Sequence, residues 1–195
     1  MVLYNFNRKI SETSRANFLK LLARGVGLVC MHHAVAAYPG WVEYENVIGA
    51  TYSLKGVVRN GMKYARPVWK HDVDFNVRIE DKSHPITKGM SDFKLNDESY
   101  KKWVYHPGSH VLLTTDQKLN NHRLAWTRFY KKARVFFIQL GHGKHAFESK
   151  DFQTLTARGI RWAGGRLPAG PGADSRKIVF LWSKGHHPNA ESSKL

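Results

Sequence analysis

Apolar and polar residues at the start of the chain follow a pattern that predicts alternating strands and helices. Met1–Phe6 is a short apolar segment of strand type, and Ser11 fits the cap of a helix. Phe18–Leu22 supplies apolar residues at helical spacing, and Gly25 fits the end of that helix. Val26–Met31 is a compact strand of buried type, followed by a sharp turn and a second helix. This order is typical of a parallel sheet with crossover helices.

The rest of the chain predicts further strands and a closing helix. Val47–Lys88 is rich in glycine and lysine, which favours loops and short strands. Within it, Val73–Ile79 has the alternating apolar residues of a strand. Val111–Thr114 and Arg134–Leu140 predict two more strands, the second almost wholly apolar, as a central parallel strand should be. Phe152–Trp162 predicts the last helix, so the fold class is α/β.

Glycine and proline near the C-terminus divide the chain into three parts. These are a domain over residues 1–166, a linker over residues 167–176 and a tail over residues 177–195. The tail contains one strand of buried type, Ile178–Trp182, and a single strand cannot stand alone. It therefore either joins the first domain's sheet, beside Met1–Phe6 or Val26–Met31, or begins a second domain.

Composition and charge exclude several classes of protein. With 195 residues and 42% hydrophobic residues, the chain has the core of one folded domain. The lone cysteine excludes a disulfide framework, a cysteine-rich zinc finger and an iron–sulfur cluster. No apolar run reaches the roughly 18 residues of a membrane helix. The start has no basic segment of a signal peptide, so the sequence as written predicts a cytoplasmic protein.

The formal net charge of +16 would favour nucleic acid as a partner if it were concentrated. The basic residues are instead spread from Arg8 to Lys194, and the tightest group, Lys131–Arg134, holds only three of them. A solvated basic surface is therefore the preferred interpretation, and nucleic-acid binding is the weaker alternative.

Histidines follow two of the predicted strands. His32 and His33 come directly after Val26–Met31, whereas His142 and His145 follow Arg134–Leu140 after a glycine. In parallel sheets ligands bind at the carboxyl ends of strands, so the two groups could converge as acid, base or metal ligands, with His33 and His145 as candidates for binding the substrate. Helix-start histidines without a role are the alternative.

Other candidate residues are fewer. Asp97 and Glu98 are adjacent carboxylates that could orient a histidine, complete a metal site or act as a base, although Asp97 also fits a helix cap. Cys30 lies inside an apolar strand, which favours a buried structural thiol over a nucleophile. The motifs of serine hydrolases, P-loop NTPases and dinucleotide-binding enzymes are missing from the sequence.

Short motifs spread over about residues 1–166 occur in the order found in the ThuA-like (trehalose utilisation) family, which the chain resembles. They are Gly27–Ala34, Trp41–Tyr44, Ile48–Tyr52, His84–Gly89, Asp97–Tyr100, Ala125–Arg128, Arg134–Phe137, Gly141-His142 and Arg158–Ala163. The resemblance implies a three-layer flavodoxin-like sandwich with a mostly parallel sheet, related to glutamine amidotransferases. Since His32 occupies the position of the amidotransferase cysteine, glutamine amidotransfer is not expected.

The resemblance also implies a role in the use of trehalose or 3-keto disaccharides, by a carbohydrate-processing hydrolase or lyase. The implied pocket contains His32, His33, Glu98, Arg128 and His142, with Trp41 and Tyr44 as sugar-stacking walls. His32 and His142 would act as acid and base or bind a divalent metal such as zinc, and Glu98 would orient them or complete the site. A non-catalytic sugar- or partner-binding module remains the alternative. The chain could also form a homo-oligomer.

The chain departs from the family pattern at its two ends. The family's usual opening strand, loop and helix, expected before Met1–Asn5, are missing, while Lys177–Pro188 resembles that opening. A permuted domain whose tail supplies the first strand would explain this, as would a fragment that runs into a second copy. A targeting segment could also lie in the missing opening.

Overall fold

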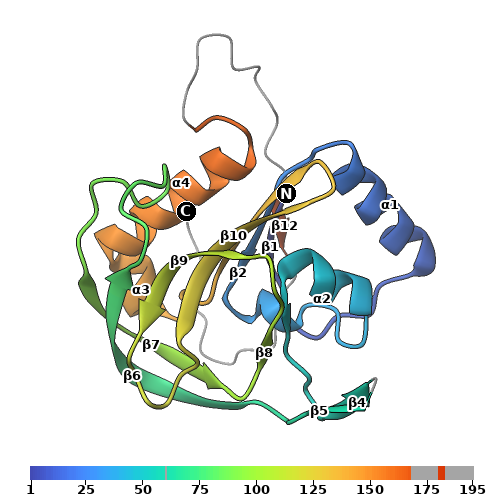
Figure 1. Ribbon diagram of the computed structural model, residues 1–195, viewed down its shortest axis with the longest axis horizontal. Helices are drawn as coiled ribbons and strands as arrows, with labels where there is room; N and C mark the ends of the chain where they lie inside the picture. Colours follow the sequence, from blue (N-terminus) through green and yellow to red (C-terminus); the bar gives the residue numbers. More distant parts are fainter. Residues whose placement is uncertain (60, 168–179, 183–195) are drawn as a thin grey trace.

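An eight-stranded sheet with helices on both faces forms the centre of the computed structural model, which describes residues 1–59, 61–167 and the backbone of 180–182 (Figure 1). Its strands are β1 (Val2–Tyr4), β2 (Leu28–Met31), β6 (Val68–Ile79), β7 (Phe93–Lys101), β9 (His110–Thr115), β10 (Arg123–Tyr130), β11 (Ala133–Ile138) and β12 (Phe180–Trp182). They lie in the order β12-β1-β2-β11-β10-β9-β6-β7.

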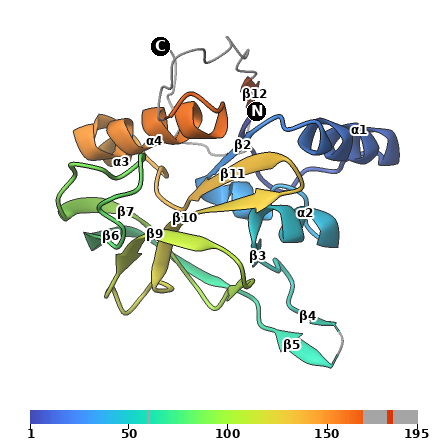
Figure 2. The ribbon, with the colours of Figure 1, turned by 45° about the horizontal axis from the view of Figure 1, so that its top comes forward.

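The helices and the smaller strands lie around this sheet. The helices are α1 (Glu12–Ala23), the 3₁₀ helix η1 (His32–Ala36), α2 (Val42–Ile48), α3 (Lys144–Glu148) and α4 (Lys150–Ala163). Two small sheets pair β3 (Ala50–Thr51) with β8 (Val104–Tyr105), and β4 (Val57–Arg59) with β5 (Met62–Tyr64). The β4–β5 hairpin projects from the body (Figure 2). In the described residues, no helix has the length and apolar character needed to cross a membrane.

The predicted α/β class and layered sandwich are confirmed, with a sheet that is more mixed than expected. The four strands from β12 to β11 run parallel, whereas every pair from β11 to β7 is antiparallel. The connection between β10 and β11 explains part of this, because it is the two-residue turn Lys131-Lys132. A turn this short can join only antiparallel strands, since a parallel pair needs a long crossover.

The C-terminal strand joins the sheet beside the first one. β12 runs parallel to β1, with Phe180 opposite Val2 and Trp182 opposite Tyr4. This is one of the two positions expected for Ile178–Trp182. The predicted linker beyond Leu167 and the tail residues 183–195 lie outside the described residues, so the division of the chain into domain, linker and tail stays a prediction.

Alternating side chains on the central strands form two apolar cores. On β11, Phe136 contributes to the core under α4, and Phe137 to the core under α1 and α2. Successive residues of a strand point to opposite faces, so a strand covered on both sides must be apolar throughout. This confirms Arg134–Leu140 as the source of a central strand.

The first helix begins and ends as predicted. The Ser11 Oγ accepts a hydrogen bond from the Ser14 N–H at 3.2 Å, and Gly25 follows the helix with a φ of +91°. Such caps satisfy backbone groups that have no partner inside the helix. The sequence therefore placed α1 correctly at both ends.

Gly159 allows α4 to approach the sheet closely, which generates a stability prediction. A Cβ at this position would overlap the ring of Phe136, which is fully buried. We expect Gly159→Ala to lower the free energy of unfolding by about 1–3 kcal/mol, although alanine normally stabilises a helix by about 1 kcal/mol relative to glycine. Urea denaturation measures this, with exposed Ala157→Gly as the helix-propensity control. Stabilisation by Gly159→Ala would contradict the close packing.

Candidate functional site

His32 lies on a sharp turn between β2 and η1. The four residues of β2 are all buried, and the chain then turns at His32, whose φ is +52°. Residues other than glycine rarely adopt this left-handed conformation, which costs conformational energy and is concentrated at functional sites. The side chain of His32 is fully buried at the carboxyl end of the strand.

His142 follows β11 on a second turn, which Asp97 and Gly141 hold in place. Gly141 has a φ of +117°, and a Cβ there would lie 2.9 Å from Cζ of Phe152. The Asp97 carboxylate accepts the Gly141 N–H at 2.7 Å and the His142 N–H at 2.9 Å. The Tyr4 hydroxyl donates to the Gly141 carbonyl at 2.7 Å. The turn carrying His142 is therefore fixed from both sides.

The alternative interpretation of Asp97 as a helix cap is wrong. Asp97 lies inside β7, a strand that the sequence analysis missed. Because consecutive strand residues point to opposite sides, Asp97 reaches the turn at Gly141 while Glu98 points toward His32.

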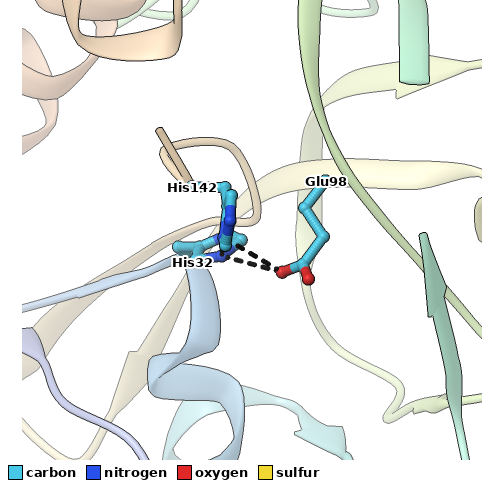
Figure 3. A group of neighbouring side chains, drawn as sticks. All are labelled: His32, Glu98 and His142. Atoms are coloured by element: carbon cyan, nitrogen blue, oxygen red, sulfur yellow. Dashed lines mark hydrogen bonds and ion pairs between the residues drawn. The ribbon is translucent and has the colours of Figure 1, made fainter. Parts of the chain in front are cut away.

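Glu98 completes a cluster with the two histidines (Figure 3). Its Oε2 lies 3.1 Å from His32 Nε2 and 3.3 Å from His142 Nδ1, and the two nitrogens are 3.1 Å apart. Within the described part of the chain, these three form a group of potential metal ligands whose atoms all lie within 4.8 Å of one another. The expected convergence of the two strand-end histidines is thus present in the structure.

The hydrogen bonds of His32 determine which nitrogen faces the cluster. Its Nδ1 lies 2.8 Å from the carbonyl of Gln139, which can only accept, so Nδ1 carries the proton. In the neutral ring, Nε2 is then an acceptor that points at the Glu98 carboxylate. The Tyr100 hydroxyl lies 2.9 Å from Nε2, and its ring stacks on that of His32 at 5.1 Å between centroids. Acceptor atoms so close together require a shared proton or a cation.

The electrostatics of the metal-free cluster favour an ion pair. Burial alone would raise the pKa of Glu98, but its hydrogen bonds with His142 and His32 outweigh this and hold the pKa well below its usual range. The hydrogen bond with Glu98 raises the pKa of His142, against the opposing effect of partial burial. Below the raised pKa of His142, the metal-free cluster therefore holds a negative carboxylate beside a protonated imidazole.

The spacing of the three atoms also fits a metal ion. In a tetrahedral zinc site with bonds of about 2.0–2.1 Å, neighbouring ligand atoms lie about 3.3 Å apart. The three separations in the cluster are 3.1, 3.1 and 3.3 Å. Two imidazoles and one carboxylate form a common donor set for zinc and other divalent transition metals, and they leave a further position open for substrate.

A β-bulge brings one more histidine to the cluster. Lys70 pairs with Ser99 and Val73 with Asp97, so two residues of β6, His71 and Asp72, lie opposite the single residue Glu98. Asp72 has a φ of +55°, and an extra residue of this kind moves the side chains before it to the other face.

As a result His71 leaves the core face of the sheet. Its Nδ1 lies 3.3 Å from Glu98 Oε1, and its ring lies 4.5 Å from that of His142. Neither His71 nor Tyr100 was predicted from the sequence as a site residue. The bulge has no simple sequence signal, but a histidine followed by an aspartate at the start of an alternating strand could have indicated it.

Both predicted sugar-stacking residues belong to the core. Trp41 and Tyr44 are buried and pack against Phe18 and Tyr38. The Tyr44 hydroxyl donates to the Ala34 carbonyl at 2.6 Å. Neither ring is available as an open wall, because Trp41, at the start of α2, and Tyr44, within it, both point into the apolar core.

The other predicted binding residues lie at different distances from the cluster. His33 is buried next to His32, with its ring 5.0 Å from that of His32 and 4.4 Å from that of Tyr4. His145 is exposed on α3. Arg128 lies on β10, over Gly49 and 3.4 Å from the Ser109 hydroxyl, outside the cluster. Of these three residues, only His33 contacts the cluster directly.

A family profile described as trehalose utilisation, ThuA, matches residues 1–163. The chain belongs to the ThuA family. No curated protein matches the sequence.

Solved structures show the same fold. A ThuA-like protein from Parabacteroides merdae matches with a TM-score of 0.70 and 23% identity, over 91% of this chain and 72% of that one. A ThuA-like protein from Bacteroides uniformis matches with a TM-score of 0.63 and 19% identity, over 85% of this chain and 69% of that one. A cytoplasmic protein from Salmonella typhimurium matches with a TM-score of 0.57 and 14% identity, over 80% of this chain and 62% of that one. At these identities the likeness shows the fold alone.

In this ThuA domain the single cysteine is structural. Cys30 is fully buried inside β2, and burial raises the pKa of its thiol to about 12. Its sulfur lies 3.6 Å from the Tyr44 hydroxyl. A thiol without access to solvent and with so high a pKa is a poor nucleophile, which agrees with the sequence interpretation.

The ion pair of the metal-free ThuA domain predicts a pH-dependent stability. Because the pKa of His142 is raised in the folded protein, its protonation adds stability at pH values below about 6.5, the pKa in the unfolded chain. This stability is lost as the pH rises through the folded pKa. The lowered pKa of Glu98 adds stability above its unfolded value near 4.5, and this is lost as the pH falls. Both contributions are therefore present between about pH 4.5 and 6.5. We expect His142→Gln to destabilise chelator-treated protein more at pH 5.5 than at pH 8, as measured by urea denaturation. An equal loss at both pH values would contradict the ion pair.

The position of Asp97 generates a second prediction. In Asp97→Asn, one carboxylate oxygen is replaced by an NH₂ group that cannot accept an N–H from Gly141 or His142. We expect the free energy of unfolding to fall by about 1–3 kcal/mol. Asp116→Asn, which removes only an exposed ion pair with Arg78, should change it by less than about 1 kcal/mol. Equal effects of the two substitutions would contradict the proposed role of Asp97.

Proposed function

We propose that this ThuA domain is a divalent-metal-dependent enzyme of carbohydrate utilisation, in which His32, Glu98 and His142 bind the metal. The observation that carries the proposal is the triangle of two imidazole nitrogens and one carboxylate oxygen, 3.1–3.3 Å apart. The three side chains come from the ends of β2 and β11 and from the middle of β7. Zinc is the simplest occupant for this donor set.

The surroundings of the three ligands support a metal site. The Gln139 carbonyl fixes the orientation of the His32 ring, and Asp97 fixes the turn that carries His142. Supporting contacts of this kind orient the ligands in metal proteins and raise metal affinity. Tyr100 and Tyr4 add hydroxyl groups that are bonded to the cluster or its turn.

A keto derivative of a disaccharide is the substrate that this site suits best. A divalent cation would supply a Lewis acid that polarises a carbonyl oxygen. The family's description, trehalose utilisation, supports a disaccharide. A carbonyl on the sugar gives the cation an oxygen to act on and makes the neighbouring C–H acidic, which suits a lyase or a hydrolase that begins by removing this proton.

His71 is the best candidate for the proton-transferring group. It is exposed, lies beside His142, and contacts the Glu98 oxygen that faces away from the two metal-binding histidines. A histidine in this position can take a proton from a sugar carbon or hydroxyl and return it to the leaving oxygen. Tyr100 holds the His32 ring in place by stacking against it.

Metal binding tests the proposal directly. We expect wild-type protein to bind about one zinc ion per chain, and His32→Ala, His142→Ala and Glu98→Gln each to weaken binding at least about 100-fold, because each removes one of three protein ligands. Isothermal titration calorimetry and elemental analysis measure this. His110→Ala is the matched control, because His110 pairs with Asp81 outside the cluster.

Activity separates the enzyme from a binding module. We expect metal-loaded protein to convert 3-keto-trehalose and chelated protein to be inactive, with His71→Ala losing turnover while keeping its metal. Binding of saccharide without any product would favour a non-catalytic module. Absence of metal binding in the wild-type protein would contradict the proposed function.

A further inference from the structure

Trp69 is an exposed aromatic residue at the edge of the metal-ligand cluster. The residue is 57% exposed, although its indole is a large apolar side chain that is usually buried. Its ring centroid lies 4.8 Å from that of His71, which in turn lies 4.5 Å from that of His142. The three rings form a continuous series from the surface to the cluster.

The bulge in β6 explains why Trp69 faces this side of the sheet. Val73 and Phe75 point into the core, and uninterrupted alternation would send His71 and Trp69 to the same face. The extra residue Asp72 shifts the pattern by one position, so Trp69 lies opposite Tyr100, which stacks on His32. The left-handed conformation of Asp72, at a φ of +55°, costs conformational energy.

We propose that Trp69 is the stacking platform for one pyranose ring of a disaccharide whose other ring lies at the His32–Glu98–His142 cluster. This inference rests on the proposed function and names a binding residue for it. The C–H groups on one face of a pyranose form an apolar surface that packs on the negative face of an indole. The sugar hydroxyls around that face meet the polar residues His71 and Asp72, which lie at the bulge next to Trp69 and are both exposed.

The placement favours a disaccharide over a single sugar. Trp69 does not touch the cluster itself, because His71 lies between them. A monosaccharide at the cluster would leave the indole uncovered, whereas a second ring extends the ligand past His71. The platform therefore adds affinity for the distant ring and leaves the metal site unchanged.

The test compares sugar binding and metal binding in the same variants. Zinc-loaded wild-type protein, Trp69→Ala and Trp69→Phe are titrated with trehalose and with glucose by calorimetry. We expect Trp69→Ala to weaken trehalose binding about tenfold, with a smaller effect on glucose, and Trp69→Phe to restore most of it. Zinc affinity should be the same in all three proteins. Phe129→Ala is the matched control, because Phe129 is 66% exposed on β10 beside Trp162 and away from the cluster.

The outcomes separate this inference from the proposed function. Unchanged trehalose binding in Trp69→Ala, or no trehalose binding by wild-type protein at high millimolar concentration, would overturn the platform. A change of oligomeric state in Trp69→Ala, measured by sedimentation, would also overturn it and assign the indole to a contact between copies. Trp69-dependent sugar binding in a protein that binds no zinc would leave the platform intact and refute the metal-dependent function.

Discussion

The whole site depends on two adjacent carboxylates of β7 that point in opposite directions. Asp97 accepts the N–H groups of Gly141 and His142 and so fixes the turn after β11. Glu98, one residue later, reaches the imidazoles of His32 and His142 on the other side. A strand is well suited to this arrangement, because consecutive side chains point to opposite faces. One carboxylate can therefore hold the turn in position while the next one contacts the imidazoles. The Asp97 carboxylate also accepts the Glu98 N–H at 2.9 Å, so it links the strand to the turn that carries His142.

Two of the five non-glycine residues with a positive φ in the described part of the chain lie at the cluster. His32 and Asp72 both adopt left-handed conformations that residues with a Cβ seldom take. His32 contacts Glu98 with its own side chain, whereas Asp72 places the neighbouring His71 against Glu98. Strained positions persist only when the surrounding packing determines them, and they are frequent where geometry matters for binding. The apolar cores on both faces of β11 supply this packing.

The sequence predicted the parts of the fold that repeat a simple physical pattern. The caps of α1, the buried strand before His32 and the apolar β11 all follow from periodicity and capping, as does the approach of the two strand-end histidines. β7 and β10 were missed, because both mix polar with apolar residues. In β7 the polar residues include Asp97 and Glu98, which serve the site rather than the core.

Aromatic residues show why the substrate side of the site was harder to predict. Trp41 and Tyr44 match the family pattern but lie in the core, at the start of α2 and within it, whereas Trp69 matches no motif and is exposed. The difference depends on a single extra residue in β6, which composition and spacing do not reveal. The positive-φ aspartate that creates the bulge became visible only through the strand register.

The strongly basic composition has little bearing on the cluster. The net charge of +16 is distributed over the sequence, whereas the carboxylates of Asp97, Glu98 and Asp72 gather at the bulge and the two histidine turns. Exposed charges farther away than about 8–10 Å are largely screened at physiological ionic strength. Buried carboxylates at hydrogen-bond distance therefore dominate the local potential. A site of this kind attracts a cation even in a basic protein, and its histidines bind that cation in their neutral form.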